Sequence, residues 1–221
     1  MDNIKLLSFF FQNNSHILPS KNLDTVLFPY LLGTKDKSIF LDLSKILPLY
    51  KKCLLLTREI FSQRGNVVLI LDNKIPFLLE KELNKFFIII KNNWAEGSIT
   101  NFSILKKTNK ILNEKGNLTS YKTSGFNSRK SRNQLTKFYK KSQTLGFLTS
   151  PPRLIISLIP VKNPLLFKEA SLLNIPIISL IGQEFKTTQK LLPSYPVIFN
   201  NTSLFMPQLF LRLLLLEAKK G

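Results

Sequence analysis

Residues 66–72 read Asn66-Val67-Val68-Leu69-Ile70-Leu71-Asp72, and this nearly continuous apolar run decides the fold class. A short run of valine, isoleucine and leucine between polar residues is typical of a strand buried on both faces of a parallel sheet. Further candidate strands of this kind span residues 38–43, 86–90, 153–159, 175–181 and 195–199. The sequence therefore predicts a sheet made largely of buried, parallel strands.

Amphipathic helical patterns lie between these runs. Apolar residues recur at helical spacing from Ile46 to Phe61, and Gly65 follows as the expected C-cap. Asn163 and Pro164 predict the N-cap and the first position of a helix over 165–173, and residues 203–219 predict a last helix. Strands that alternate with helices of this length favour an α/β fold, with a doubly wound parallel sheet and right-handed crossovers.

Residues 101–150 break this alternation. They contain no strand-like run and carry two polar helical patterns around Gly116 and Gly125, which predict an inserted helical hairpin. The expected organisation is one discontinuous α/β body, residues 1–100 and 151–221, with the hairpin inserted at 101–150.

The charge of the chain points to a polyanionic partner. Lysine and arginine number 32 against 13 acids among 221 residues, for a net charge of +19. The positive charges of such a chain repel one another. Binding to nucleic acid or to an anionic membrane surface is therefore favoured over having no particular ligand. The longest apolar run, Leu204 to Leu216, is broken by Pro207 and Arg212 and is shorter than the roughly 20 residues of a spanning helix. We therefore expect no membrane insertion.

Most of the excess charge lies in the predicted hairpin, where a single acid, Glu114, opposes the basic residues. Lysine and arginine neutralise phosphates, and interleaved aromatics such as Tyr121 and Phe138 can stack on unpaired bases. A solvated charged face and a membrane-surface helix are the alternatives, but the segment lacks a broad apolar face for lipid. The candidate RNA-binding residues are Lys106, Lys107, Lys110, Lys115, Lys122, Arg129, Lys130, Arg132, Lys137, Lys140 and Lys141.

The sequence contains few of the residues and motifs that catalysis or cofactor binding would need. No glycine-rich phosphate loop occurs, so a nucleotide cofactor is not expected. Asp42 and Asp72 end predicted strands, where they are expected to cap helices or remain solvated more often than to form a site. His16 is the only histidine and Cys53 the only cysteine, which leaves no metal-ligand set and no nucleophile with a nearby base. We expect Cys53 to fill the core, and we predict no catalytic residue, no metal and no cofactor.

Two stretches give a resemblance to a known family. The first runs from Phe86 to Phe102 and contains Trp94, Gly97 and the triplet Thr100-Asn101-Phe102. The second comprises residues 152–159, then Lys168-Glu169-Ala170, then Leu173-Asn174-Ile175-Pro176-Ile177. Together with Pro29-Tyr30-Leu31-Leu32-Gly33, Ile39 to Leu43 and His16, they are similar in order and spacing to the small-subunit ribosomal protein S2 family.

The resemblance implies a flavodoxin-like sheet with a protruding helical hairpin, and a protein that binds small-subunit rRNA beside other ribosomal proteins. Trp94, Gly97, Thr100, Asn101 and Phe102 would be its signature residues, with Trp94 and Asn101 more often holding the strand-to-hairpin junction than touching RNA. The chain departs from the family pattern at Ala95-Glu96-Gly97, at 186–193 and at 197–202, which bears on contacts with neighbouring proteins.

We therefore expect a structural constituent of the small ribosomal subunit, not an enzyme and not a homo-oligomer. The alternatives are a non-ribosomal RNA-binding assembly factor and, less favoured, a nucleotide-dependent enzyme on the same fold. No targeting segment is evident in Met1 to Ser20, which fits synthesis in the compartment of use. The sequence departs far from the bacterial-like pattern of the family, which plastid members tend to keep. This departure favours the mitochondrion, with the plastid as the less favoured organelle.

Overall fold

The computed structural model describes residues 3–19, 25–71, 76–91, 94, 96–107, 148, 150–158, 164–182, 193–198, 200 and 205–221. The chain separates into two compact units, one comprising Met1–Asn93 and Pro152–Gly221 and the other Trp94–Pro151. We refer to them as the body and the insertion. Most of the helical hairpin predicted for 101–150 lies outside the described residues, so that hairpin stays a prediction.

The body is built on a five-stranded parallel sheet, which confirms the predicted fold class. Its strands are β4 (Val67–Leu71), β5 (Ile88–Lys91), β6 (Leu154–Ser157), β7 (Ile177–Ile181) and β8 (Tyr195–Ile198). Their spatial order is β5-β4-β6-β7-β8, and every neighbouring pair is parallel. This is the strand order of flavodoxin-like folds. All residues of β4, β6 and β7 are buried, as their largely apolar runs predicted.

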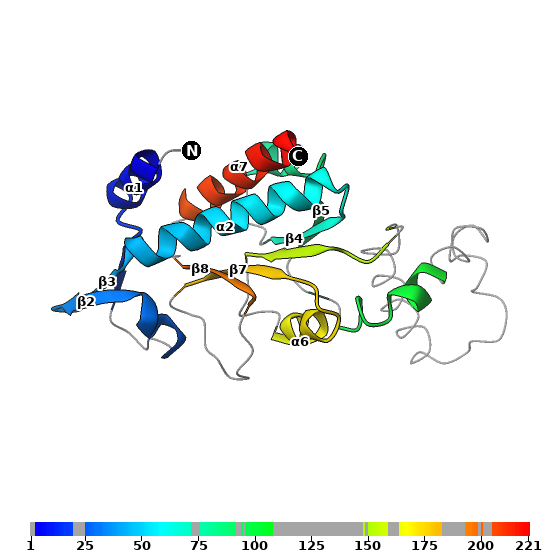
Figure 1. Cartoon of the computed structure of the whole chain (residues 1–221), viewed down its shortest axis with the longest axis horizontal. Helices are drawn as coiled ribbons and strands as arrows, with labels where there is room; N and C mark the ends of the chain where they lie inside the picture. The colour runs from blue at the N-terminus through cyan, green and yellow to red at the C-terminus, as the bar shows by residue number, and fades with distance from the viewer. Residues whose placement is uncertain are drawn as a thin grey trace. The chain divides into compact units, whose positions relative to one another are not determined.

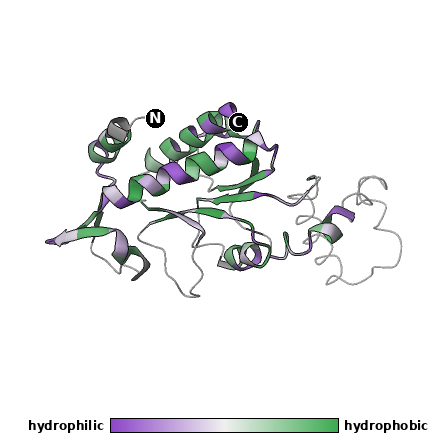
Figure 2. Cartoon of the chain, in the orientation of Figure 1, coloured by the Kyte–Doolittle hydropathy of each residue, from purple (hydrophilic) through white to green (hydrophobic). Residues whose placement is uncertain are grey.

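Helices cover both faces of this sheet. The long helices α2 (Leu43–Ser62) and α7 (Phe205–Lys220) lie side by side on one face, and α6 (Pro164–Leu172) lies on the other (Figure 1). The α2 ribbon alternates between hydrophobic and hydrophilic colour because only one stripe of the helix meets the sheet (Figure 2). A short helix that the sequence did not predict, α3 (Phe77–Leu83), precedes β5.

An aromatic cluster lies where α2, α7 and the first helix meet. That first helix, α1 (Asn3–Gln12), was also not predicted. The Tyr50 ring makes edge-to-face contacts with Phe10 and Phe210, with ring centroids 5.6 and 5.2 Å apart. All three side chains are fully buried. These contacts join the beginning, middle and end of the body chain into one core.

The prediction that residues 38–43 form a parallel strand of the main sheet is wrong. These residues give β3 (Ser38–Leu41), which pairs antiparallel with β1 (Ile17–Pro19) and β2 (Leu31–Lys35) in a separate three-stranded sheet. Side chains in β3 alternate between buried and partly buried, so only one face meets the core. The tight turn at Asp36, whose φ is +54°, allows only an antiparallel return of β2 to β3.

Asn200, just after β8, joins the small sheet to the main one. Its backbone N–H donates to the carbonyl oxygen of Ser15 at 3.0 Å, and its side-chain amide donates to that of Ile17 at 2.8 Å. β1 is thereby held close to the end of an edge strand of the main sheet. A short 3-10 helix, Thr25–Tyr30, leads into β2 and completes this part of the body.

The C-terminal end of α2 differs from the prediction in detail. The C-cap is Gln63, and the left-handed residue after it is Arg64, with φ +53°, not Gly65. The N–H groups of Gly65 and Arg64 donate to the carbonyl oxygens of Ile60 and Phe61, the hydrogen-bond pattern of a Schellman motif. Glycine is required at 65 for space, because a Cβ there would lie 2.7 Å from the Ile60 side chain.

Candidate RNA-binding surface

The start of the insertion shows what the family signature residues do locally. Gly97 has φ +76°, and its carbonyl oxygen accepts the N–H of Asn101 at 3.0 Å. A Cβ at Gly97 would lie 2.9 Å from the Asn101 side-chain nitrogen. The Asn101 carbonyl then accepts the N–H of Leu105 at 3.0 Å, which opens a helix over residues 102–107. Glycine is therefore favoured here by its positive φ, whereas a Cβ would only require the exposed Asn101 amide to move.

The apolar signature residues are packed, and the polar ones face solvent. Trp94 and Phe102 are buried within the described structure, together with Leu105 and Ile99, whereas Thr100 and Asn101 are exposed. This arrangement explains Trp94, Gly97 and Phe102 by folding alone. It leaves Thr100 and Asn101 accessible to a ligand, and an RNA contact at either position stays a prediction.

Of the predicted RNA-binding residues, the structure describes Lys106 and Lys107. Both lie on the 102–107 helix and both are exposed. The other members of the set lie outside the described residues: Lys110, Lys115, Lys122, Arg129, Lys130, Arg132, Lys137, Lys140 and Lys141. The described part of the insertion thus presents two adjacent lysines on a helix in which Phe102 and Leu105 are buried and Ile104 is exposed.

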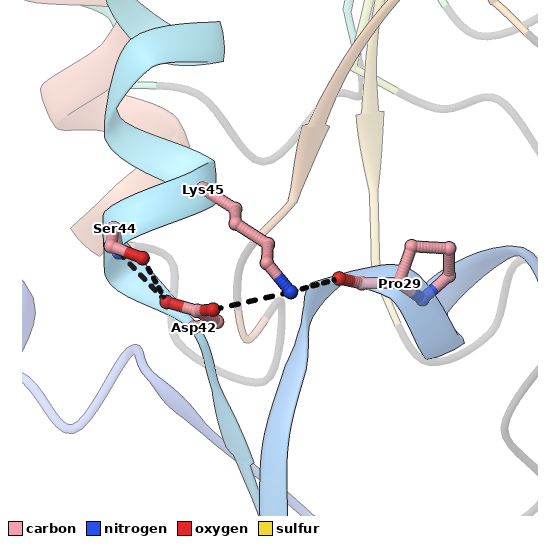
Figure 3. Close-up of polar contacts among 4 residues, drawn as sticks. All are labelled: Pro29, Asp42, Ser44 and Lys45. Atoms are coloured by element: carbon pink, nitrogen blue, oxygen red, sulfur yellow. Dashed lines mark hydrogen bonds and ion pairs between the residues drawn. The ribbon is translucent and has the colours of Figure 1, made fainter.

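Asp42, considered as a ligand-binding acid, is the N-cap of α2. Its carboxylate accepts the backbone N–H of Ser44 at 3.0 Å and the Ser44 hydroxyl, and it forms a 3.4 Å ion pair with Lys45 (Figure 3). The Lys45 ammonium also donates to the carbonyl oxygen of Pro29 at 2.9 Å. The hydrogen bond from Ser44 is the main cause that lowers the pKa of Asp42. The capping role expected for this acid is confirmed, while Asp72 lies outside the described residues.

The candidate nucleophile and base are both held in packing roles. Cys53 is fully buried in α2, and burial raises the pKa of its thiol to about 12, so the thiol is neutral at physiological pH. The predicted role of Cys53 in the core is thereby confirmed. His16 lies 4.8 Å from the Phe11 ring, centroid to centroid, and its Nδ1 lies 3.3 Å from the carbonyl oxygen of Phe10. No group of three or more metal-ligating side chains occurs in the part of the chain that the structure describes.

A second group of exposed cations lies on the body. Its members are not clustered in the sequence. Arg58, Arg64, Lys85, Arg153 and Lys219 are exposed on segments near the amino ends of the parallel strands. The Arg153 guanidinium donates to the Gln63 side-chain oxygen at 3.3 Å, which places it against the end of α2. Sequence reading missed this group because its members are separated by up to 161 positions and only the fold gathers them.

Fold and charge together define the class of this molecule. It is a doubly wound α/β protein, and its net charge of +19 favours a polyanionic partner. None of its described helices is long and apolar enough to cross a membrane. The family model described as "Ribosomal protein S2" matches residues 19–221, and the chain belongs to that family.

Two relatives show how far the chain has diverged within it. It is 26% identical over 191 residues to "Small ribosomal subunit protein uS2m" of Marchantia polymorpha, covering 84% of this chain and 79% of that protein. It is 24% identical over 159 residues to "Small ribosomal subunit protein uS2" of Desulfatibacillum aliphaticivorans, covering 69% of this chain and 54% of that protein. The chain thus spans about half the length of the bacterial relative.

Proposed function

We propose that this protein is a structural constituent of the small subunit of a mitochondrial ribosome, where it binds small-subunit rRNA. The match of the ribosomal protein S2 model to residues 19–221 carries the proposal. The names of both relatives support the small subunit, and the mitochondrial designation of the Marchantia protein favours that organelle over the plastid.

RNA binding by this chain would be mainly electrostatic. Each lysine or arginine that neutralises a phosphate releases condensed counterions, so affinity should fall steeply as salt rises. Lys106 and Lys107 would contribute cations on the 102–107 helix, while the buried parallel sheet gives a rigid body that can dock by shape. Neighbouring ribosomal proteins would be further partners, and no self-association is required.

A non-catalytic role agrees with the chemistry of the body. The Cys53 thiol is inaccessible, and Asp42 is committed to Ser44 and Lys45. In the described body, these groups are held in structural interactions. The protein would act by occupying its position on folded RNA, and neither a cofactor nor a metal would be part of that action.

Sedimentation tests the proposal directly. Lysates of purified mitochondria and of plastids are separated on sucrose gradients in high salt, and the chain is quantified by mass spectrometry against other small-subunit proteins. We expect near-equal amounts in the mitochondrial small subunit and monosome. A chain that stays at the top of the gradient, or follows only precursor particles, would point to an assembly factor, and recovery in plastid ribosomes would reject the mitochondrial assignment.

A further inference from the structure

Three separate segments of the body meet at the end of α2. Gly65 lies so close to Arg153 that a Cβ at 65 would be 3.0 Å from the Arg153 Cδ. A Cβ at Gly221 would lie 2.5 Å from the carbonyl oxygen of Arg58, so the end of α7 lies against the last turn of α2. In addition, the Phe61 ring packs edge-to-face on Phe87, with centroids 5.2 Å apart, which brings the segment before β5 to the same place.

These contacts gather exposed cations at the amino edge of the parallel sheet. Arg58 and Arg64 come from the end of α2, Lys85 from the segment before β5, Arg153 from the residue before β6, and Lys219 from the last turn of α7. We call these five residues the amino-edge surface. The acids on the same segments are Glu59, Glu82 and Glu217, and Glu217 is paired with Lys220 at 2.6 Å.

Ion pairing within the described structure neutralises some cations of the body but none of the amino-edge surface. Among the described residues, Lys45 pairs with Asp42 and Lys91 with Glu80. No described carboxylate lies within ion-pair distance of the five amino-edge residues. The five exposed cations come from four chain segments and outnumber the three acids on those segments, so the surface keeps a positive field that favours a polyanion.

Arg64 shows that local stability alone does not explain this surface. It occupies the left-handed position of the Schellman motif, where glycine is the usual residue because a Cβ is disfavoured there. A cation at the carboxyl end of a helix is favourable for the helix dipole, but that benefit does not require a left-handed arginine. The backbone is held in a strained conformation and an exposed guanidinium results.

We propose that the amino-edge surface binds the phosphate backbone of folded RNA, as a contact distinct from the insertion. The proposal rests on the ribosomal function proposed above. Guanidinium groups bind phosphate oxygens bidentately, and Arg58, Arg64 and Arg153 lie on three rigid supports: a helix, its cap and a strand start. The surface lies at the amino ends of the strands. Open α/β sheets bind small molecules at the opposite edge, so we assign this surface to the phosphate backbone of RNA and not to a small molecule.

The test compares two full-length variants with equal loss of charge. The amino-edge variant carries Arg58→Gln, Arg64→Gly and Lys219→Gln, and it leaves Arg153 in place because its stem packs on Gly65. The control carries Lys35→Gln, Lys37→Gln and Lys168→Gln, which are also exposed but lie on the small sheet and on α6. Binding to deproteinised small-subunit rRNA from the same organelle is measured from about 0.05 to 0.5 M salt.

We expect the amino-edge variant to bind on the order of a hundredfold more weakly at about 0.1 M salt, with a log–log salt slope smaller by about 2–3. The control should lose far less. Equal losses in the two variants, or an amino-edge variant that binds like the wild type, would overturn the proposal while leaving the ribosomal function intact. A wild-type protein without salt-dependent rRNA binding would reject both.

Thermal melting distinguishes a binding surface from a merely structural one. If these cations only complement helix ends, the amino-edge variant should melt lower and bind RNA as the control does, and that result would contradict the proposal. If they bind RNA, the single variant Arg64→Gly should melt at the same temperature as the wild type or higher, because it relieves a left-handed Cβ, and should still bind more weakly.

Discussion

The body and the insertion use their residues in opposite ways. In the body, β4, β6 and β7 are buried at every position and contain no charged residue. In the insertion, residues 101–150 oppose their eleven lysines and arginines with one acid, Glu114. If the proposed function is correct, we expect a division of labour, in which the body supplies folding free energy and the insertion supplies most of the electrostatic attraction to RNA. Stability and RNA affinity should therefore respond to different mutations.

The largest expected effect tests the insertion side of this comparison. Changing Arg129, Lys130 and Arg132 together to Glu removes three cations and adds three anions, so we expect association with the small subunit to weaken at least a hundredfold at about 0.1 M salt and its salt dependence to flatten. Thermal melting of the body should not change. A reversal of Lys35, Lys37 and Lys168 to Glu is the matched control, and unchanged association of the first variant would reject the role of the insertion.

A core truncation tests the body side. Leu69 is fully buried at the centre of β4, between β5 and β6. We expect Leu69→Ala to lower the free energy of unfolding by about 2–5 kcal/mol, since it removes apolar contacts and leaves a cavity. Urea denaturation measures the loss. At temperatures where the variant is still folded, its rRNA affinity should match that of the wild type, and a proportional loss of affinity would contradict the division of labour.

The same comparison explains what the sequence could predict. Runs such as 67–71 and 177–181 are apolar except for Ser179 because both sheet faces are covered, so strand and burial could be predicted together. Residues 38–43 looked similar and were followed by a helix. Their antiparallel partners gave no signal, because β1 has only three residues and β2 is mostly exposed and contains Gly33. α1 was also missed, because its apolar run of Leu6 to Phe11 shows no clear polar face.

Prediction of the site was limited by distance along the chain. Asp42 and Ser44 are close in sequence, and the helix cap that they form was among the expected roles. The amino-edge cations come from segments that only the folded sheet brings together, so no local pattern could reveal them. The signature around Trp94 and Gly97 was found by resemblance, and its structural reason, a left-handed turn against Asn101, depends on backbone geometry that composition does not encode.

A smaller effect is expected at the N-cap of α2. Asp42→Ala removes the acceptor for the Ser44 N–H and should lower the melting temperature by about 2–4 °C near pH 7. The pKa of Asp42 is lowered in the folded protein, mainly by its hydrogen bond from Ser44, so the carboxylate stabilises the fold above its unfolded pKa of roughly 3.9. This contribution is lost as the pH falls through the folded pKa. The melting temperatures of the two proteins should converge as the pH falls through the folded pKa, and a difference that stays constant in acid would contradict the assignment.

The smallest expected effect is a gain in stability at Tyr50. Its hydroxyl is fully buried and has no hydrogen-bond partner among the described residues, whereas its ring packs on Phe10 and Phe210. Tyr50→Phe keeps the ring contacts and removes an unsatisfied polar atom, so the free energy of unfolding should rise by up to about 1 kcal/mol.

The alkaline limb of the stability profile gives an independent check of the same substitution. Burial, and secondarily the nearby Cys53 thiol, raises the pKa of Tyr50, so the unfolded chain releases the phenolic proton first and stability falls above pH 10 or so. Tyr50→Phe should make this fall shallower. The control is Tyr195→Phe on the edge strand β8, where Tyr195 is only partly buried and lies 5.5 Å from the Lys52 ammonium. A loss of stability in Tyr50→Phe would show that the buried hydroxyl is hydrogen-bonded in solution, and would contradict this prediction.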